Sequence, residues 1–491
     1  MSRTLGGVRS APPPHPRADG YRRRVVAFVA FGTVVVLLSI VATVARVGPV
    51  PMRQVASAAE RPNVVLIVTD DQRADSVWAM PKVRTLLGGS GVTFTSAVVS
   101  NPLCCPSRAA ILTGTYSHTN GVWRNAPPDG GFESFDDRST IATWLDRAGY
   151  RTGLFGKYLN GYRRTDGAYV PPGWDRWFSF RNPRYYDYAI SDDGELETYG
   201  DDERDYSTRV LSRELLRFVG SGRQPFFALF APYAPHKPSI PAPGDEDAFP
   251  IVGPPPSLAF DEADVTDKPA WVQALRRIGE EKEAKLVEDR RDALRSMLAV
   301  DRAVRALVRT LDERGVLEDT VIIFTSDNGF ALGEHRWTNK RAAYEESIRV
   351  PLVVRYDALG MAGGSSDSLV ANIDLAPTIA ALAGVTASGA DGISLEPILR
   401  DPSAARGREG VILEHLAKRN DVIPTYCGFR TARHVYVRYA TGEEELYDLR
   451  NDPDQLRNVA SEPGSGPLID TMRSRIQPRC RPPDPAFSWS D

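Results

Sequence analysis

The stretch Val64–Thr69, VVLIVT, followed directly by Asp70 and Asp71, decides the class of fold. Six consecutive apolar or β-branched residues are typical of a strand that is buried on both faces of a sheet. Other short apolar runs are also predicted to be strands: Thr93–Val99, Tyr150–Phe155, Phe226–Ala231, Val321–Thr325 and Leu352–Arg355. Helical patterns alternate with these runs, and this alternation predicts an α/β fold.

The helical patterns are amphipathic. Two are expected at Thr140–Ala148 and Tyr206–Val219, and a longer charged helix is expected from Asp289 to Arg314. Gly315 suits the C-terminal cap of the long helix, and a further helix begins near Asp374. Residues 240–258 are rich in proline and are expected to form a surface loop.

The pattern changes after about residue 405. Val435–Tyr439 and Glu444–Leu449 are predicted to form a hairpin through Thr441 and Gly442. We therefore expect a small, mostly antiparallel C-terminal subdomain at residues 406–491, after a catalytic domain at residues 61–405.

The first sixty residues carry the signals that predict where in the cell the protein is located. Residues 1–24 are expected to be a disordered cytoplasmic tail, and residues 46–60 a linker. Between them, Val25–Ala45 contains no charged residue and is long enough to span a bilayer as a helix. Arginines are more frequent before this segment than after it, which predicts a membrane anchor with the catalytic part outside the cytoplasm. The alternative is a secreted protein, cleaved after the small residues Ala56-Ser57-Ala58.

Composition excludes several classes of protein. The chain has 491 residues, of which 42% are hydrophobic, and a formal net charge of −3 with four cysteines. These values are typical of a globular protein and not of a disordered chain or a disulfide scaffold. The near-neutral charge argues against a partner that is a nucleic acid.

Polar residues follow several of the predicted strands. Asp70 and Asp71 come after Val64–Thr69, and Asp327 and Asn328 come after Val321–Thr325. Ligands of open α/β sheets bind beyond the carboxyl ends of the strands, and these oxygen donors suit Ca²⁺ or Mg²⁺. The alternative is that they are ordinary turn and capping residues.

Two basic residues follow other strands of the same sheet. Lys157 comes just after Tyr150–Phe155, and His236 comes after Phe226–Ala231. Because both are expected at the same edge of the sheet, a cationic, proton-donating site is predicted there.

The most specific pattern is Cys104-Cys105-Pro106-Ser107-Arg108, followed by Thr113 and Gly114. Proline is preferred in the first turn of a helix, so Cys104 is expected at a helix N-terminus, where anions are favoured. The alternative is a buried pair of thiols or a disulfide partner.

This pattern resembles the signature of the type I sulfatases, in which a cysteine is oxidised to Cα-formylglycine. In that signature the modified cysteine stands two positions before the proline, which is Cys104 here. The resemblance covers roughly residues 61–460 and includes Pro235-His236 and Lys340–Pro351. Three segments are most similar to the N-acetylglucosamine-6-sulfatase-like branch: Gly156–Asn160, Tyr169–Trp174 and Asn182–Tyr188.

The resemblance implies a fold and a site. The fold would be an alkaline-phosphatase-like α/β/α sandwich with a large mixed sheet, plus a small C-terminal antiparallel sheet. One Ca²⁺ would be held by Asp70, Asp71, Asp327, Asn328 and the formylglycine at Cys104. Arg108 and Lys157 would bind the formylglycine hydrate and the sulfate, whereas His236 and Lys340 would face the leaving oxygen.

The implied reaction is hydrolysis of a sulfate monoester of a carbohydrate or an aryl alcohol. It would proceed through the formylglycine hydrate and a covalent sulfate intermediate, which divides one difficult step into two. A formylglycine-generating enzyme would be a partner during maturation, and a sulfated small molecule or glycan would be the substrate. Many arylsulfatases carry a histidine at the position of Leu159, so the base for sulfate elimination stays open, with His118 and His335 as candidates.

Two other functions stay open. A phosphonate monoester or phosphodiester hydrolase of the same superfamily can use the same kind of site, and an inactive exported binding protein is the alternative from another class.

The remaining thiols are Cys105, which is expected to be buried and inert, and Cys427 and Cys480. Export permits a disulfide between the last two, but the sequence does not determine that pairing.

Overall fold

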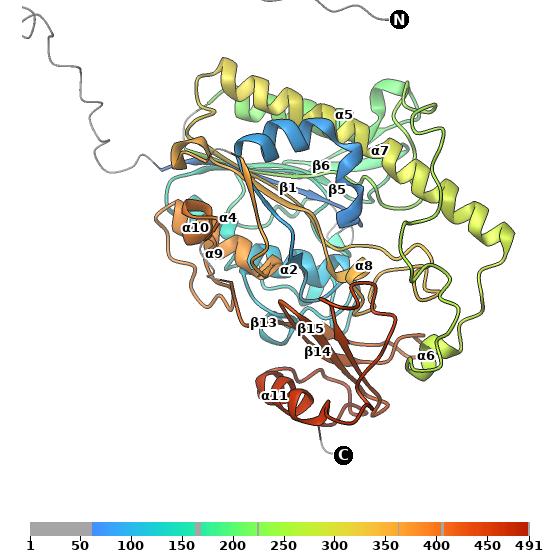
Figure 1. Cartoon of the computed structure of the whole chain (residues 1–491). Helices are drawn as coiled ribbons and strands as arrows, with labels where there is room; N and C mark the ends of the chain where they lie inside the picture. The colour runs from blue at the N-terminus through green and yellow to red at the C-terminus, as the bar shows by residue number, and fades with distance from the viewer. Residues whose placement is uncertain (1–60, 163–167, 223–224, 362, 404–406, 490–491) are drawn as a thin grey trace, which may run out of the picture. The chain divides into compact units, whose positions relative to one another are not determined.

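The computed structural model describes residues 61–162, 168–222, 225–361, 363–403 and 407–489 (Figure 1). The expected membrane anchor Val25–Ala45, with its flanking tail and linker, lies outside these residues. Within the described ranges, no helix combines the length and the apolar character needed to cross a bilayer.

A ten-stranded mixed sheet forms the centre of the fold, in the order β11-β2-β10-β9-β1-β8-β4-β5-β6-β7. Strands β9, β1, β8, β4 and β5 are mutually parallel, whereas β10 runs antiparallel to both β9 and β2. The bounds are β1 (Asn63–Thr69), β2 (Val92–Phe94), β4 (Arg151–Gly156), β5 (Arg176–Phe180), β6 (Tyr188–Asp192), β7 (Glu195–Tyr199), β8 (Phe226–Ala231), β9 (Thr320–Ser326), β10 (Leu352–Arg355) and β11 (Gly364–Ser366).

Helices cover both faces of this sheet, as Figure 1 shows. One layer contains α5 (Ser207–Gly220) and α7 (Glu280–Glu313), and the other contains α2 (Cys104–Thr113), α4 (Ile141–Arg147), α9 (Leu375–Leu382) and α10 (Glu396–Arg400). Successive residues of β1 serve opposite layers: Val65 packs in the core beneath α5 and α7, and Leu66 packs in the core beneath α2 and α4. This two-sided burial explains the continuous apolar run and confirms the predicted α/β class.

Two predicted elements differ from the structure. The single strand expected at Thr93–Val99 is two strands, because β2 ends at Phe94 and β3 (Ala97–Val98) pairs with β12 (Val370–Ala371) in a separate sheet. The helix expected from Asp289 begins at Glu280. Its first turn contains Glu280, Glu281 and Glu283, which stabilise a helix N-terminus without contributing apolar periodicity.

Four further helices occur within the described residues. These are α3 (Ser117–Asn120), α6 (Ala270–Gln273), α8 (Glu345–Ile348) and α11 (Gly466–Ile476). Single turns of 3-10 or π type occur at η1 (Ala74–Ala79), η2 (Val83–Leu87), η3 (Gly88–Ser90), η4 (Phe132–Ser134), η6 (Glu203–Asp205), η7 (Asp357–Leu359) and η8 (Asn372–Asp374).

A second, antiparallel sheet lies towards the C-terminus. Its order is β13-β14-β15-β16, with bounds β13 (Gly410–His415), β14 (Tyr426–Thr431), β15 (His434–Tyr439) and β16 (Glu444–Asp448). The predicted hairpin is β15–β16, which the register confirms. Tyr426 and Tyr436 of this sheet share one apolar core with Trp271 and Tyr344 of the preceding segment, so the small sheet packs against the catalytic part.

A disulfide joins Cys427 of β14 to Cys480, which follows α11. The two cysteines are 53 residues apart and both are fully buried. The bond therefore ties the C-terminal helix to the small sheet.

We expect the variant with both Cys427→Ala and Cys480→Ala to melt at least about 3 °C below the wild type. Removing a native disulfide of this loop length costs roughly 2–5 kcal/mol. Differential scanning calorimetry measures the difference, and a reductant added to the wild type provides a matched comparison. An unchanged melting temperature in both experiments contradicts a stabilising role for this bond.

Candidate active site

The ends of β1 and β9 bring four polar residues together. The strands are parallel neighbours with Thr69 opposite Ser326, so the residues that follow each strand lie at one edge of the sheet. The Asp71 N–H donates to Asp327 Oδ1 at 3.0 Å, and Asn328 Nδ2 donates to Asp71 Oδ1 at 2.7 Å. Asp71 has φ = +66°, a left-handed conformation that short polar residues tolerate.

The next parallel strands bring Lys157 to the same edge. Gly156 ends β4 with φ = +123°, and a Cβ atom there would lie 2.0 Å from the Ala231 carbonyl oxygen. The close approach lets the Lys157 N–H donate to that oxygen at 2.8 Å. The side chain then reaches Asp70, with Nζ 2.6 Å from Oδ2.

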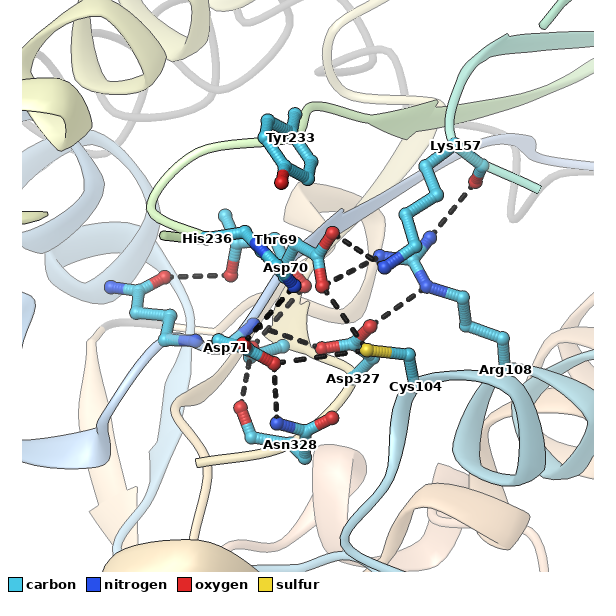
Figure 2. Close-up of polar contacts among 12 residues, drawn as sticks. Thr69, Asp70, Asp71, Cys104, Arg108, Lys157, Tyr233, His236, Asp327 and Asn328 are labelled. Carbon is cyan, nitrogen blue, oxygen red and sulfur yellow. Dashed lines mark hydrogen bonds and ion pairs between the residues drawn. The ribbon is translucent and has the colours of Figure 1, made fainter. Parts of the chain in front are cut away.

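Helix α2 supplies Cys104 and Arg108. Cys104 is its first residue, as predicted, and its Sγ lies 3.5 Å from Asp70 Oδ1 and 3.8 Å from Asp71 Oδ1. Arg108 is one turn further along the helix and on the same face. Its Nε donates to Asp327 Oδ2 at 2.8 Å and its Nη1 donates to the Lys157 carbonyl oxygen at 2.9 Å (Figure 2).

Two further side chains complete the cluster. Lys340 Nζ lies 2.6 Å from Asp71 Oδ1 and 2.8 Å from Cys104 Sγ. His236 Nε2 lies 3.6 Å from Asp71 Oδ2, while its Nδ1 is 2.6 Å from the Lys237 carbonyl oxygen. Figure 2 shows the labelled side chains converging on the same small volume.

The charges of the cluster are buried and balanced. Three carboxylates, on Asp70, Asp71 and Asp327, face three cations, on Arg108, Lys157 and Lys340. Burial raises the pKa of Asp70, but Lys157, His236 and Arg108 outweigh this effect and lower that pKa to about 2. Burial lowers the pKa of Lys340, but Asp71 reverses this effect and holds that pKa well above its usual range. Asp70 and Lys340 are therefore both charged near pH 7.

Some polar atoms of the cluster have no hydrogen-bond partner among the described residues. Asn328 Oδ1 is buried and accepts no hydrogen bond, and Arg108 Nη2 is buried and donates none, although it lies 4.0 Å from Asp70 Oδ1. Ligand atoms of Asp70, Asp71, Cys104 and His236 all lie within 4.8 Å of one another. An unpartnered amide oxygen beside three carboxylates fits a hard divalent cation, and an unpartnered guanidinium N–H fits an anion.

The structure thus brings together every residue that the sequence predicts for the site. The two candidate bases have other contacts. His118 Nδ1 lies 2.6 Å from Glu414 Oε1, and His335 Nδ1 lies 2.7 Å from Glu262 Oε2. Burial lowers the pKa of His335 to about 3, so that ring is neutral near pH 7.

Two supporting residues were not predicted from the sequence. The Tyr233 ring stacks on His236 with 4.7 Å between the ring centroids, which orients the imidazole. Asn125 Oδ1 accepts from the Cys105 N–H at 2.8 Å, which satisfies a free donor at the start of α2. Tyr233 lies three residues before the conspicuous His236, whereas nothing in the local sequence distinguishes Asn125.

Two models of known protein families match this chain. Residues 62–385 match the model of the family described as Sulfatase, and residues 333–481 match the model described as N-sulphoglucosamine sulphohydrolase, C-terminal. The chain belongs to the sulfatase family. It is a sulfuric ester hydrolase.

Relatives of this sulfatase include N-acetylglucosamine-6-sulfatases. The Homo sapiens protein of that name is 33% identical over an alignment of 494 positions, which covers 89% of each chain. The Volvox carteri arylsulfatase is 30% identical over an alignment of 473 positions, which covers 82% of this chain and 72% of the relative. The type I sulfatase resemblance is therefore confirmed.

Solved structures support the fold. A protein in complex with its substrate D-glucosamine-2-N,6-O-disulfate has a TM-score of 0.73 and 26% identity, covering 85% of this sulfatase and 97% of that chain. The phosphonate monoester hydrolase of Agrobacterium radiobacter has a TM-score of 0.69 and 23% identity, covering 85% and 95%. These likenesses confirm the alkaline-phosphatase-like α/β architecture with its large mixed sheet.

Glu346 of α8 carries a carboxyl oxygen, Oε2, that is buried without a hydrogen-bond partner in the described structure. Burial and then repulsion by Glu334 raise the pKa of Glu346 to about 8, although Arg73 opposes both effects. The folded protein therefore retains a proton that the unfolded chain releases above its ordinary pKa near 4.5. Between these two values stability falls as pH rises, because the unfolded state binds fewer protons.

We expect Glu346→Gln to melt at a higher temperature than the wild type, with a difference that grows from pH 5 to pH 8 and then levels off. The slope is on the order of 1 kcal/mol per pH unit. Thermal melts across that range measure it, with the exposed Glu313→Gln as the control. A pH-independent difference contradicts the raised pKa.

Proposed function

We propose that this sulfatase hydrolyses a sulfate monoester of a carbohydrate, of the glucosamine 6-sulfate class. The observation that carries the proposal is the joining of Cys104, Arg108 and Lys157 to the carboxylates in one buried cluster. Two similar proteins support the sugar class: one is an N-acetylglucosamine-6-sulfatase, and the other binds D-glucosamine-2-N,6-O-disulfate as its substrate.

We further propose that Cys104 is oxidised to formylglycine by a formylglycine-generating enzyme, and that one Ca²⁺ occupies the acidic cluster. When present, the hydrated aldehyde supplies the hydroxyl nucleophile that attacks sulfur. When bound, Ca²⁺ offsets the negative charge of the sulfate. Asp70, Asp71, Asp327 and Asn328 would hold the ion, together with the oxidised side chain of residue 104.

The cations of the cluster would bind the sulfate. Arg108 is fixed by Asp327 Oδ2 and by the Lys157 carbonyl oxygen, which leaves the buried Nη2 for an anion. Lys157 contacts the other oxygen of the Asp70 carboxylate from the one nearest Arg108, with Nζ 2.6 Å from Oδ2. Because these donors are already oriented, they stabilise developing negative charge without reorganisation.

Proton transfer to the leaving oxygen is assigned to His236, with Lys340 as the second donor. The Lys237 carbonyl oxygen can only accept, so His236 Nδ1 carries a proton and Nε2 is the atom that faces the cluster. A proton at Nε2 can pass to an alcohol oxygen as the ester bond breaks. Tyr233 keeps the ring in this orientation.

Substrate comparison tests the proposal. The enzyme purified from its native host, or expressed with a formylglycine-generating enzyme, is assayed on N-acetylglucosamine 6-sulfate, an aryl sulfate and an aryl phosphate diester. We expect the highest kcat/KM on a sulfate ester. A large preference for the diester would assign the chain to phosphonate and phosphodiester hydrolysis instead.

Peptide mass spectrometry across residue 104 tests the modification separately. Conversion of cysteine to formylglycine replaces the thiol with an aldehyde oxygen and changes the mass of the peptide accordingly. Only unmodified cysteine in fully active enzyme would exclude the formylglycine proposal.

We also propose that the catalytic part lies outside the cytoplasm, on an anchor at Val25–Ala45. The Cys427–Cys480 disulfide supports export, because such bonds persist in oxidising compartments. Protease treatment of intact cells tests this. An exported, anchored domain is accessible to the protease, so its signal in the membrane fraction is expected to disappear. Activity found only in the culture medium would favour the secreted alternative.

A further inference from the structure

A cavity of about 410 Å³ opens beside the catalytic cluster, on the side of Lys340. Its wall includes Leu103, which precedes Cys104 in the chain, and Lys340, whose Nζ lies 2.8 Å from Cys104 Sγ. The far wall comes from the end of β13, where His415 is the last residue, and from the segment after it, which includes Lys418. A substrate whose sulfate occupies the catalytic cluster would therefore extend directly into this cavity.

The lining of the cavity contains more cations than carboxylates. Besides Lys340 it contains Arg124, Arg341 and Lys418, and the one carboxylate in the lining is Asp421. Arg341 Nη1 pairs with Asp421 at 2.8 Å, which offsets one of these charges. Arg124 Nη2 pairs with Asp129 at 3.0 Å, but its Nε is buried and has no partner among the described residues. Lys418 is exposed at the rim.

His415 is the most informative residue of this lining. Its side chain is 1% exposed, and neither ring nitrogen makes a hydrogen bond of normal geometry within the described structure, although the backbone of Ile423 is close. Burial, and then the neighbouring Arg341, lower the pKa of His415 to about 3, so the ring is neutral near pH 7. A buried polar ring without partners is costly unless a ligand or water completes it.

The neighbouring cavity has a different character. It is about 310 Å³, begins at Lys157 and shares the wall Asn125–Pro127 with the first cavity. Its polar lining contains three amides, from Asn125, Asn160 and Asn182, beside the cations Lys157 and Arg181. Amides suit the neutral hydroxyl groups of a sugar, whereas clustered guanidinium and ammonium groups suit a negative charge.

We propose that the cavity between Lys340 and Lys418 binds a second negatively charged group of the substrate, one that is not hydrolysed. Lys418 provides a positive charge, and the unpartnered Nε–H of Arg124 and the buried ring of His415 provide hydrogen bonds to the anion. The group is a sulfo or carboxylate substituent, on the sugar that carries the scissile sulfate or on the sugar next to it. This inference rests on the proposed carbohydrate sulfatase function and narrows the substrate to a polyanionic glycan.

Substrates that share the scissile 6-sulfate and differ elsewhere test the proposal. We expect kcat/KM to be at least about tenfold higher for N-sulfoglucosamine 6-sulfate, or for a disaccharide carrying a neighbouring uronate, than for N-acetylglucosamine 6-sulfate. A preference for the first probe places the anion on the same sugar, and a preference for the second places it on the neighbour. An aryl sulfate, which has no second anion, reports on the catalytic cluster alone.

Variants of the lining decide whether this cavity causes the preference. We expect Lys418→Gln and Arg124→Gln each to reduce the preference at least about threefold, mainly by raising KM, and the double variant to reduce it to within about twofold of unity. Rates on the aryl sulfate change less than about twofold. Lys282→Gln removes an equally exposed charge from α7 and leaves the preference unchanged.

The outcomes separate this inference from the proposed function. If the wild type hydrolyses the neutral and the doubly anionic sugars equally well, the inference is wrong and the carbohydrate sulfatase function stands. If the preference exists but survives in the double variant, the anion binds elsewhere and the inference is also wrong. If no sugar sulfate is hydrolysed while the aryl sulfate is, the proposed substrate class itself fails.

Discussion

Replacing Cys104 by serine is expected to reduce turnover of every sulfate ester by at least about a thousandfold. Loss of a nucleophile commonly costs this much or more, because the remaining residues only bind and polarise the substrate. Serine in a mature chain cannot supply the geminal diol of a hydrated aldehyde. A single hydroxyl that became sulfated would have no second hydroxyl with which to release the sulfate.

The structure predicts that this variant folds normally. Cys104 Sγ contacts Asp70, Asp71 and Lys340 but is not part of an apolar core. A serine Oγ fits the same position and can hydrogen-bond the same partners. We therefore expect a melting temperature within about 2 °C of the wild type and a thermal shift on adding Ca²⁺ that is largely retained, because four of the five expected ligands are unchanged.

Cys105 provides the matched control. It is the neighbouring residue and equally buried, but it packs in the core beneath α2 and α4 and faces away from the acidic cluster. We expect Cys105→Ser to retain at least about a third of the wild-type turnover while losing some stability. Near wild-type turnover by Cys104→Ser, or a complete loss in Cys105→Ser, would contradict the assignment of Cys104.

Local sequence patterns predicted the strands that consist of a continuous run of apolar residues. Strands β1, β8 and β9 are continuous β-branched or aromatic runs because helices cover both of their faces. Strands β7 and β11 were missed because they lie at the two edges of the sheet and are largely exposed, so they carry little apolar signal. Strand β13 was missed because it ends in two polar residues, Glu414 and His415, although both are buried. The buried Glu414 carboxylate is paired with His118, which is far away in the sequence, so the local pattern does not indicate its burial.

The site was more predictable than the fold for a physical reason. Parallel strands end at one edge, so residues such as Asp70 and Asp327 meet there whenever the strands are neighbours. What local sequence cannot contain is the support: the Arg108 guanidinium is fixed by the Lys157 carbonyl oxygen, 49 residues away. Lys340 and Asn125 likewise reach Cys104 and Cys105 only through tertiary packing.

Replacing Asp71 by asparagine is expected to reduce turnover by at least about a hundredfold and to abolish the thermal shift that Ca²⁺ produces in the wild type. Even outer partners of metal ligands typically change affinity or activity 10–100-fold, and Asp71 lies within the donor cluster itself. Asparagine tolerates the left-handed backbone at this position, so the loop geometry is retained. Because a bound ion stabilises only the folded state, calcium-dependent melting measures binding without an assay of activity.

The same substitution leaves Lys340 buried without its carboxylate at 2.6 Å, which costs up to about 3–5 kcal/mol when the other charge stays in place. Adding Lys340→Met to Asp71→Asn removes that unpaired charge, so we expect the double variant to regain most of the lost melting temperature. It regains neither the calcium shift nor turnover, because both require the Asp71 carboxylate. Asp146→Asn on the exposed face of α4 controls for the lost charge. If calcium still stabilises the double variant as it does the wild type, Asp71 does not hold the ion.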